Sequence, residues 1–178
     1  MRTTRLLCLS GSLRKGSYNT TVLQAMSALA PDKTDVILFE HLGILPLFNP
    51  DLDDMHIAEV KLLRDAVQQA DGLMIASPEY AHGISGVMKN ALDWLVSDEN
   101  FPGKPVLLLN TSPRASHAQT ALVEVLKTMS ADVIDTITVP LLGSGLDVGG
   151  VLKNAEISKV LKHGLDVFCE TILQPSES

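Results

Sequence analysis

The segment of the chain that is richest in chemically useful side chains is a polar stretch at residues 10–20, which follows a short apolar run. It supplies hydroxyls, an amide and a guanidinium from Ser10, Ser12, Arg14, Ser17, Asn19 and Thr20. Helical periodicity begins directly after it, and the unpaired N–H groups of a helix N-terminus favour an anion. The stretch therefore predicts a cradle for one phosphate group. The plainer interpretation is that Ser17 or Asn19 caps the helix and that Arg14 is solvated.

A second candidate segment follows the third apolar run and contains Pro78, Glu79, Tyr80, Ala81, His82 and Gly83. Proline and glycine favour a tight loop, on which a tyrosine and a histidine could flank a planar ligand while backbone amides reach its polar edge. The alternative interpretation treats Glu79 as a solvated carboxylate and His82 as a surface histidine. No serine or aspartate stands beside His82 at the spacing of a catalytic triad, so we assign it no general-base role. Ser85 is expected to cap the helix that follows.

Three further segments carry weaker signals. Residues 110–117, which include Ser112, form either a second wall of a site or a simple turn and cap. Asn90 and Trp94 share one helical face, which indicates internal packing or a subunit contact. The glycine-rich run at 143–150 lacks the lysine of a phosphate loop and is interpreted as a connector. Neither G-x-G-x-x-G nor G-x-x-x-x-G-K-[ST] occurs in the loop at 10–20, so a dinucleotide fingerprint and a P-loop are excluded there.

The elements that position these loops follow from hydrophobic periodicity. Short apolar runs at residues 5–9, 36–39, 73–76, 106–109 and 133–139 predict five strands. They alternate with five helical patterns around residues 22–29, 60–67, 87–95, 122–129 and 157–172. This alternation indicates a doubly wound parallel sheet with right-handed crossovers, in one domain over residues 1–178. Such sheets bind ligands beyond the carboxyl ends of their strands, where both candidate loops lie.

Composition narrows the class of protein. The chain has 178 residues, with 14 Lys and Arg against 21 Asp and Glu, a net charge of −7, and 4% aromatic residues. An acidic chain is a poor nucleic-acid binder, and no apolar stretch approaches the ~20 residues of a membrane helix. Cys8 and Cys169 show no metal-ligand spacing, so no metal site is expected. A reducing cytoplasmic location is the simplest expectation.

Three sequence segments carry a resemblance to the NADPH-dependent FMN reductase family of flavodoxin-like proteins, which includes chromate, quinone and azoreductase-like enzymes. The segments are residues 11–19, 45–52 and 78–94. The resemblance implies a three-layer α/β/α sandwich whose five parallel strands are ordered 2-1-3-4-5. It implies that Ser12, Arg14, Ser17, Asn19 and Thr20 hold the FMN phosphate, and that Pro78, Glu79, Tyr80, His82 and Gly83 contact the isoalloxazine. Ser10, Ala81 and Ser112 complete the expected cofactor contacts.

Two departures from the family pattern concern the ring end of that site. Ala81 stands where the family often has Asn, and Ser112-Pro113-Arg114 replaces a glycine-rich stretch. Arg114 is also a candidate for binding a phosphate of the nicotinamide cofactor, the alternative being a solvated side chain.

The activity implied by the resemblance is a ping-pong transfer of electrons from NADPH or NADH through FMN to a small acceptor. Candidate acceptors are a flavin, a quinone, an azo compound or a metal oxyanion such as chromate. The flavin carries the chemistry, which agrees with the lack of an acid, base or nucleophile at catalytic spacing. A flavodoxin-type electron carrier and a non-catalytic flavin-binding sensor are the alternatives. A homodimer or homotetramer is expected, with Leu47-Phe48 and the helix of Trp94 as candidate contacts, and neither nucleic acid nor membrane as partner.

Overall fold

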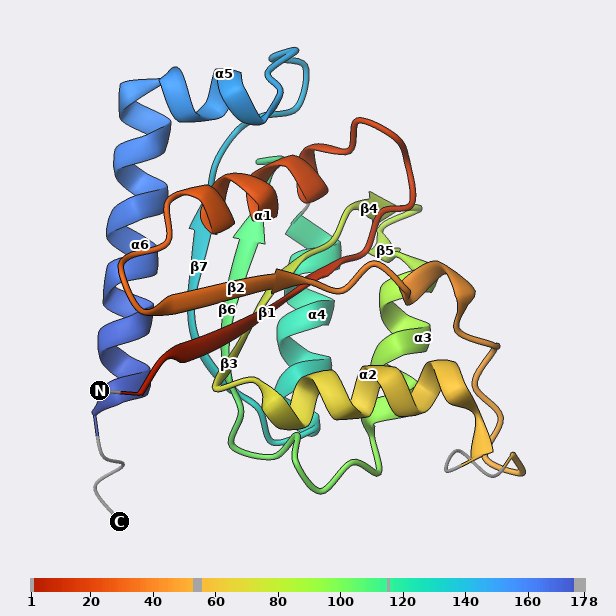
Figure 1. Ribbon diagram of the computed structural model, residues 1–178. Helices are drawn as coiled ribbons and strands as arrows, with labels where there is room; N and C mark the ends of the chain where they lie inside the picture. Colours follow the sequence, from red (N-terminus) through yellow and green to blue (C-terminus); the bar gives the residue numbers. More distant parts are fainter. Residues whose placement is uncertain (1, 53–55, 115, 175–178) are drawn as a thin grey trace.

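Five parallel strands form the central sheet of the computed structural model, which describes residues 2–52, 56–114 and 116–174 (Figure 1). They are β1 (Thr4–Ser10), β2 (Thr34–Leu38), β3 (Gly72–Ala76), β6 (Pro105–Asn110) and β7 (Asp132–Thr138). Their spatial order is β2-β1-β3-β6-β7. Counted in chain order, these strands have the expected order 2-1-3-4-5, so the predicted topology is confirmed. Ala115, within the predicted loop at 110–117, lies outside the described residues.

Helices cover both faces of the sheet (Figure 1). They are α1 (Tyr18–Ala28), α2 (Ala58–Gln69), α3 (Gly86–Leu95), α4 (Ser116–Thr128), α5 (Val148–Lys153) and α6 (Ala155–Leu173), with a short 3₁₀ helix, η1 (Leu42–Ile44). Alternate residues of β1 belong to different cores: Leu7 and Leu9 pack with α2, α3 and α4, whereas Leu6 and Cys8 pack with α1, α5 and α6. The expected three-layer sandwich is therefore confirmed.

The hydrophobic patterns of the strands follow from their positions in the sheet. All five residues of the central strand β3 are buried, as expected of a parallel strand covered on both faces. The edge strand β2 alternates half-buried and exposed residues. Cys8, on β1, is 1% exposed, and burial raises the pKa of its thiol to about 12. This cysteine is an inert core residue, as its apolar surroundings predict.

Two small elements differ from the sequence-based expectation. The predicted loop after β3 contains a hairpin, β4 (Glu79–Tyr80) and β5 (Gly83–Ile84). The run at 143–150, predicted to be a connector, instead becomes helical at Val148, because the Asp147 side chain caps α5 by accepting a hydrogen bond from the Gly150 N–H at 2.7 Å. Both elements are too short to give a periodic signal. Within the described ranges, no helix has the length and apolar character needed to cross a membrane.

Candidate functional site

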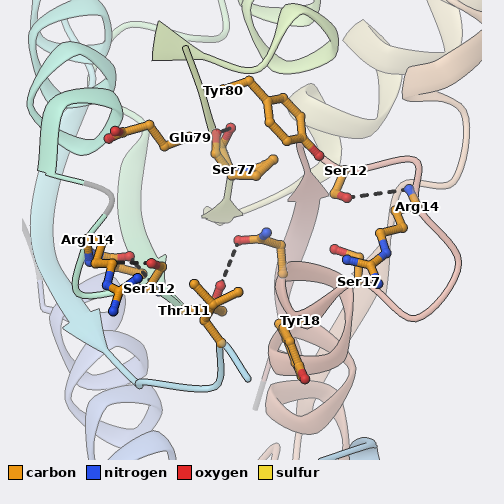
Figure 2. Close-up of a pocket in the computed structure, with 14 residues that line it drawn as sticks. Ser12, Arg14, Ser17, Tyr18, Ser77, Glu79, Tyr80, Thr111, Ser112 and Arg114 are labelled. Carbon is orange, nitrogen blue, oxygen red and sulfur yellow. Dashed lines mark hydrogen bonds between the residues drawn. The ribbon is translucent and has the colours of Figure 1, made fainter. Parts of the chain in front are cut away.

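The loops that follow β1, β3 and β6 surround a pocket of about 310 Å³ at the carboxyl ends of the strands (Figure 2). Most of the residues that line it have polar side chains, and two of them are arginines. The lining residues are Ser12, Arg14, Ser17, Tyr18, Asn19, Ser77, Pro78, Glu79, Tyr80, Asn110, Thr111, Ser112, Arg114 and Leu142. The location agrees with the rule that open α/β sheets bind ligands where the strand order reverses.

Most of the site residues predicted from sequence lie in this pocket. They are Ser12, Arg14, Ser17, Asn19, Pro78, Glu79, Tyr80 and Ser112. Ser10 and Thr20 are joined by a 2.8 Å hydrogen bond between their hydroxyls and line a neighbouring hollow that shares Ser12 and Arg14 with the pocket. The structure places Ala81, His82 and Gly83 at the hairpin, outside the lining. Five predicted site residues thus lie outside the lining of the pocket: Ser10, Thr20, Ala81, His82 and Gly83.

The N-terminus of α1, which follows the loop after β1, lines the pocket. Ser17 occupies the N-cap position, yet its hydroxyl accepts no hydrogen bond from the helix. Gly16, with φ of +70°, turns the chain into the helix in a conformation that suits glycine. The helix start thus leaves N–H donors, the Ser17 hydroxyl and the Arg14 guanidinium available to an anion. This donor set fits a phosphate, and the interpretation of Ser17 as a simple side-chain cap is not supported.

Gly11 allows the loop after β1 to lie close to the loop after β3. Its N–H donates to the Ala76 carbonyl at 2.8 Å. A Cβ at this position would lie 2.5 Å from the Ser77 hydroxyl and 2.7 Å from that of Ser85. Ser85 itself caps α3 by accepting the Met88 N–H at 3.2 Å, as predicted. A side chain at residue 11 would therefore displace the Ser77 and Ser85 hydroxyls or move the two loops apart.

The hairpin β4–β5 forms the wall that carries Tyr80, whose side chain points toward Ser12 in Figure 2. The two residues at its turn, Ala81 and His82, have φ of +49° and +59°. This left-handed backbone is typical of a two-residue hairpin turn, where Asn-Gly is favoured. Here two residues with Cβ atoms adopt it instead, which costs energy. The hairpin is thus a strained element held over the pocket.

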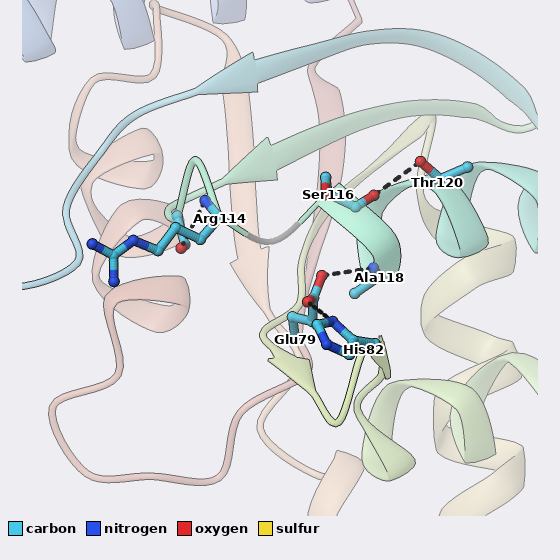
Figure 3. Close-up of polar contacts among 7 residues, drawn as sticks. Glu79, His82, Arg114, Ser116, Ala118 and Thr120 are labelled. Atoms are coloured by element: carbon cyan, nitrogen blue, oxygen red, sulfur yellow. Dashed lines mark hydrogen bonds and ion pairs between the residues drawn. The ribbon is translucent and has the colours of Figure 1, made fainter.

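Glu79 fastens the hairpin to the start of α4 (Figure 3). One carboxylate oxygen accepts the Ala118 N–H at 2.9 Å, and the other lies 3.1 Å from Nδ1 of His82. The hydrogen bond from Ala118 is the main reason that the pKa of Glu79 lies below its ordinary value. The rings of His82 and His117 meet with centroids 4.6 Å apart. Glu79 is therefore a paired carboxylate, and the interpretation as a solvated one is wrong.

The third wall combines the loop after β6 with side chains from α1. The Asn19 carboxamide oxygen accepts the Thr111 hydroxyl proton at 3.3 Å, which ties this loop to the first. Ser112 donates its N–H to Asn110 Oδ1 at 3.0 Å. Asn110, Thr111, Ser112 and Arg114 line the pocket, so the second-wall interpretation holds for these residues of the predicted loop.

Sequence reasoning missed Tyr18, Ser77 and Leu142 as lining residues. The hydroxyl of Tyr18 also accepts the Gly145 N–H at 2.9 Å, so it connects the site to the segment before α5. The chain has two tyrosines, and both line this pocket. That rarity was the available signal for Tyr18. Leu142 gave none, because it is an apolar residue with no polar motif beside it to mark a site.

Asn90 and Trp94 act inside the protein. Asn90 Nδ2 and Trp94 Nε1 both donate to the Pro46 carbonyl, at 2.9 and 2.8 Å. The Trp94 ring is 1% exposed and meets Phe48 edge-on with centroids 5.0 Å apart. This face of α3 anchors the segment at 45–48, so the internal-packing interpretation is confirmed and the Trp94 ring itself is not available to a second subunit.

Comparison with known proteins agrees with this geometry. The family model described as NADPH-dependent FMN reductase matches residues 4–144. The chain belongs to this family. A quinone reductase of Escherichia coli (strain K12) is 37% identical over 112 residues, and an NAD(P)H-dependent FMN reductase of Pseudomonas aeruginosa is 39% identical over 111 residues. Each match covers 61% of this chain and 60% of the relative's own length.

A solved structure supports the same fold for this FMN reductase family member. The flavoenzyme NAD(P)H:(acceptor) oxidoreductase FerB from Paracoccus denitrificans superposes with a TM-score of 0.77 at 26% identity, covering 95% of this chain and 97% of that one. The family description implies FMN, and the site passes a simple test of fit. The pocket offers an uncapped helix start with Arg14 for a phosphate, and a wall bearing Tyr80 beside it. Among the described residues, no group of His, Cys, Asp or Glu could hold a metal ion.

Proposed function

We propose that this chain is an NAD(P)H-dependent oxidoreductase that binds FMN in the pocket between the loops after β1, β3 and β6. The observation that carries the proposal is the uncapped start of α1, which opens beside Arg14 into a pocket walled by Tyr80. Membership of the FMN reductase family supports it. When bound, FMN supplies the hydride-accepting and electron-donating chemistry.

The residues of the chain bind and orient in this proposal. Ser12, Arg14 and Ser17, with the first N–H groups of α1, hold the phosphate, as a helix N-terminus does for anions. Pro78 and Tyr80 face the ring on one side, and the loop at 110–112 faces it on the other. Glu79 keeps the hairpin wall in place through its bond to α4. The side chain of Tyr80 is 57% exposed, so the pocket remains open to a second ligand.

The electron acceptor in this proposal is a quinone or another small molecule, and the two substrates use the open side of the pocket in turn. The relatives named quinone reductase support that class of acceptor. Azo compounds, free flavins and metal oxyanions such as chromate remain candidates for comparison. Parallel lines in double-reciprocal plots of rate against NADPH at several quinone concentrations are expected for this ping-pong order, and intersecting lines would refute it.

A dimer or tetramer of this chain is part of the proposal. Leu47 is 84% exposed and Phe48 is 40% exposed on the segment that α3 anchors. Ile44 on η1 and Leu13, which lies against the neighbouring Gly43, are also exposed apolar residues. A second copy would remove this apolar surface from water. Sedimentation equilibrium at several concentrations tests the assembly, and a monomer at all of them would refute it.

The activity is tested by adding NADPH anaerobically to the purified protein reconstituted with FMN. Rapid loss of the oxidised-flavin absorbance, followed by its return when a quinone is added, is expected for the reductase. A protein that binds FMN but does not bleach would instead be an electron carrier or a sensor. A protein that does not bind FMN would refute the site itself.

A further inference from the structure

Arg114 lies across the pocket from Arg14, at the opposite side in Figure 2. The two arginines come from different loops, after β6 and after β1. Within residues 2–52, 56–114 and 116–174, no carboxylate forms an ion pair with either guanidinium. Figure 3 shows the Arg114 side chain extending away from the pair formed by Glu79 and His82. Two arginines without an ion pair among the described residues therefore line one cavity of a chain whose net charge is −7.

The phosphate cradle already accounts for one of these charges. FMN carries a single phosphate, and the loop after β1 surrounds it with Arg14, Ser12, Ser17 and the start of α1. Arg114 stands on another wall and adds nothing to that cradle. A second cation on the pocket lining indicates a second anionic ligand. Of the dinucleotide and the quinone acceptor that the relatives' names favour, only the dinucleotide carries fixed negative charge, on its phosphates.

The backbone beneath Arg114 is ordered by its neighbours. The Arg114 N–H donates to the Ser112 hydroxyl at 3.4 Å, and the Ser112 N–H donates to Asn110 Oδ1 at 3.0 Å. Pro113 fixes its own φ and restricts Ser112. The backbone that carries Arg114 is thus restrained, which limits the part of the pocket wall from which the side chain extends.

We propose that Arg114 binds a phosphate of the nicotinamide dinucleotide and determines the affinity of the enzyme for that substrate. The proposal rests on the proposed function, because it assigns a residue for one substrate of the same site. A planar guanidinium matches phosphate oxygens with two parallel hydrogen bonds, which a solvated lysine does not reproduce. Arg114 is in this respect a substrate-binding residue on the wall of the pocket opposite Arg14.

The test compares the Arg114→Ala holoprotein with wild type for binding of NADP⁺ and NAD⁺, measured by calorimetry without turnover. The Kd for NADP⁺ is expected to rise roughly 10- to 100-fold, as for loss of a charge-assisted hydrogen bond. Arg114→Lys should recover part of the loss. A rise confined to NADP⁺ identifies the 2′-phosphate, and a rise for both identifies the pyrophosphate. Lys127→Ala, which removes a cation from the last turn of α4 outside the pocket, is the matched control.

A parallel titration measures the affinity of each apoprotein for FMN by flavin fluorescence. It should be the same for wild type and Arg114→Ala. Unchanged NADP⁺ and NAD⁺ affinities, or an equal loss of FMN affinity, would overturn the assignment of Arg114. Failure of wild-type holoprotein to bind either dinucleotide would refute the proposed function instead, so the two failures are distinguishable.

Discussion

The backbone at the turn of the β4–β5 hairpin is strained, and the size of the strain can be predicted. At His82, φ is +59°, a conformation in which a Cβ costs roughly 1–2 kcal/mol. Glycine escapes that cost but loses more entropy on folding, by roughly 0.5–1 kcal/mol. The His82→Gly variant should therefore be more stable than His82→Ala by about 1 kcal/mol. Both variants lose the contact with Glu79, which the 78% exposed His82 side chain makes weak.

Urea unfolding followed by circular dichroism measures this difference. In thermal unfolding, a difference of 1 kcal/mol corresponds to a shift in Tm of roughly 2–4 °C for a chain of this size. Ala81→Asn is the companion variant, since Asn tolerates the left-handed conformation that Ala81 adopts at φ +49°, and it should stabilise the protein by a few tenths of a kcal/mol. If His82→Gly were no more stable than His82→Ala, the turn of the β4–β5 hairpin would not be strained.

Three further predictions concern the other walls. Arg14→Ala should weaken FMN binding roughly 10- to 100-fold in a fluorescence titration, while Lys15→Ala should leave it unchanged, because Lys15 is outside the pocket lining. Since the folded state lowers the pKa of Glu79 from its ordinary 4.5, its contribution to stability is present above that value. It is lost as the pH falls through the lowered pKa, so the unfolding free energy of Glu79→Gln should fall less in acid than that of wild type. Gly11→Ala should cost about 1–3 kcal/mol through steric overlap with Ser77, whereas Gly86→Ala, with no neighbouring atom within 4 Å, should not destabilise the protein.

The strands and helices were predictable because their periodicity is a direct consequence of burial. All residues of β3 are buried, and its sequence is an unbroken apolar run. The helix α2 has one apolar stripe, formed by Val60, Leu63 and Val67. The hairpin was not predictable from periodicity. Its strands have two residues each, and its turn contains Ala81 and His82 instead of the residues that favour such turns.

The site was predictable to different degrees at its two ends. The predicted phosphate cradle is contiguous in sequence, so the clustering of Ser12, Arg14 and Ser17 before a helix was enough to predict that they line one pocket. The remaining walls depend on pairs far apart in the chain, such as Glu79 with Ala118 and Tyr18 with Gly145. Side-chain spacing within one segment contains no information about such pairs. Interpretation from the sequence could therefore name Glu79 but not its partner.

The phosphate end and the ring end of the site should respond differently to substitution. In the proposed complex, the phosphate end depends on side chains that touch the ligand, so its variants should change binding directly. The ring end depends on bonds between protein groups, such as those of Glu79 with Ala118 and with His82. Loss of these bonds would let the walls separate without removing a ligand contact. Binding of a phosphate alone should then survive such substitutions, while binding of the complete FMN should weaken.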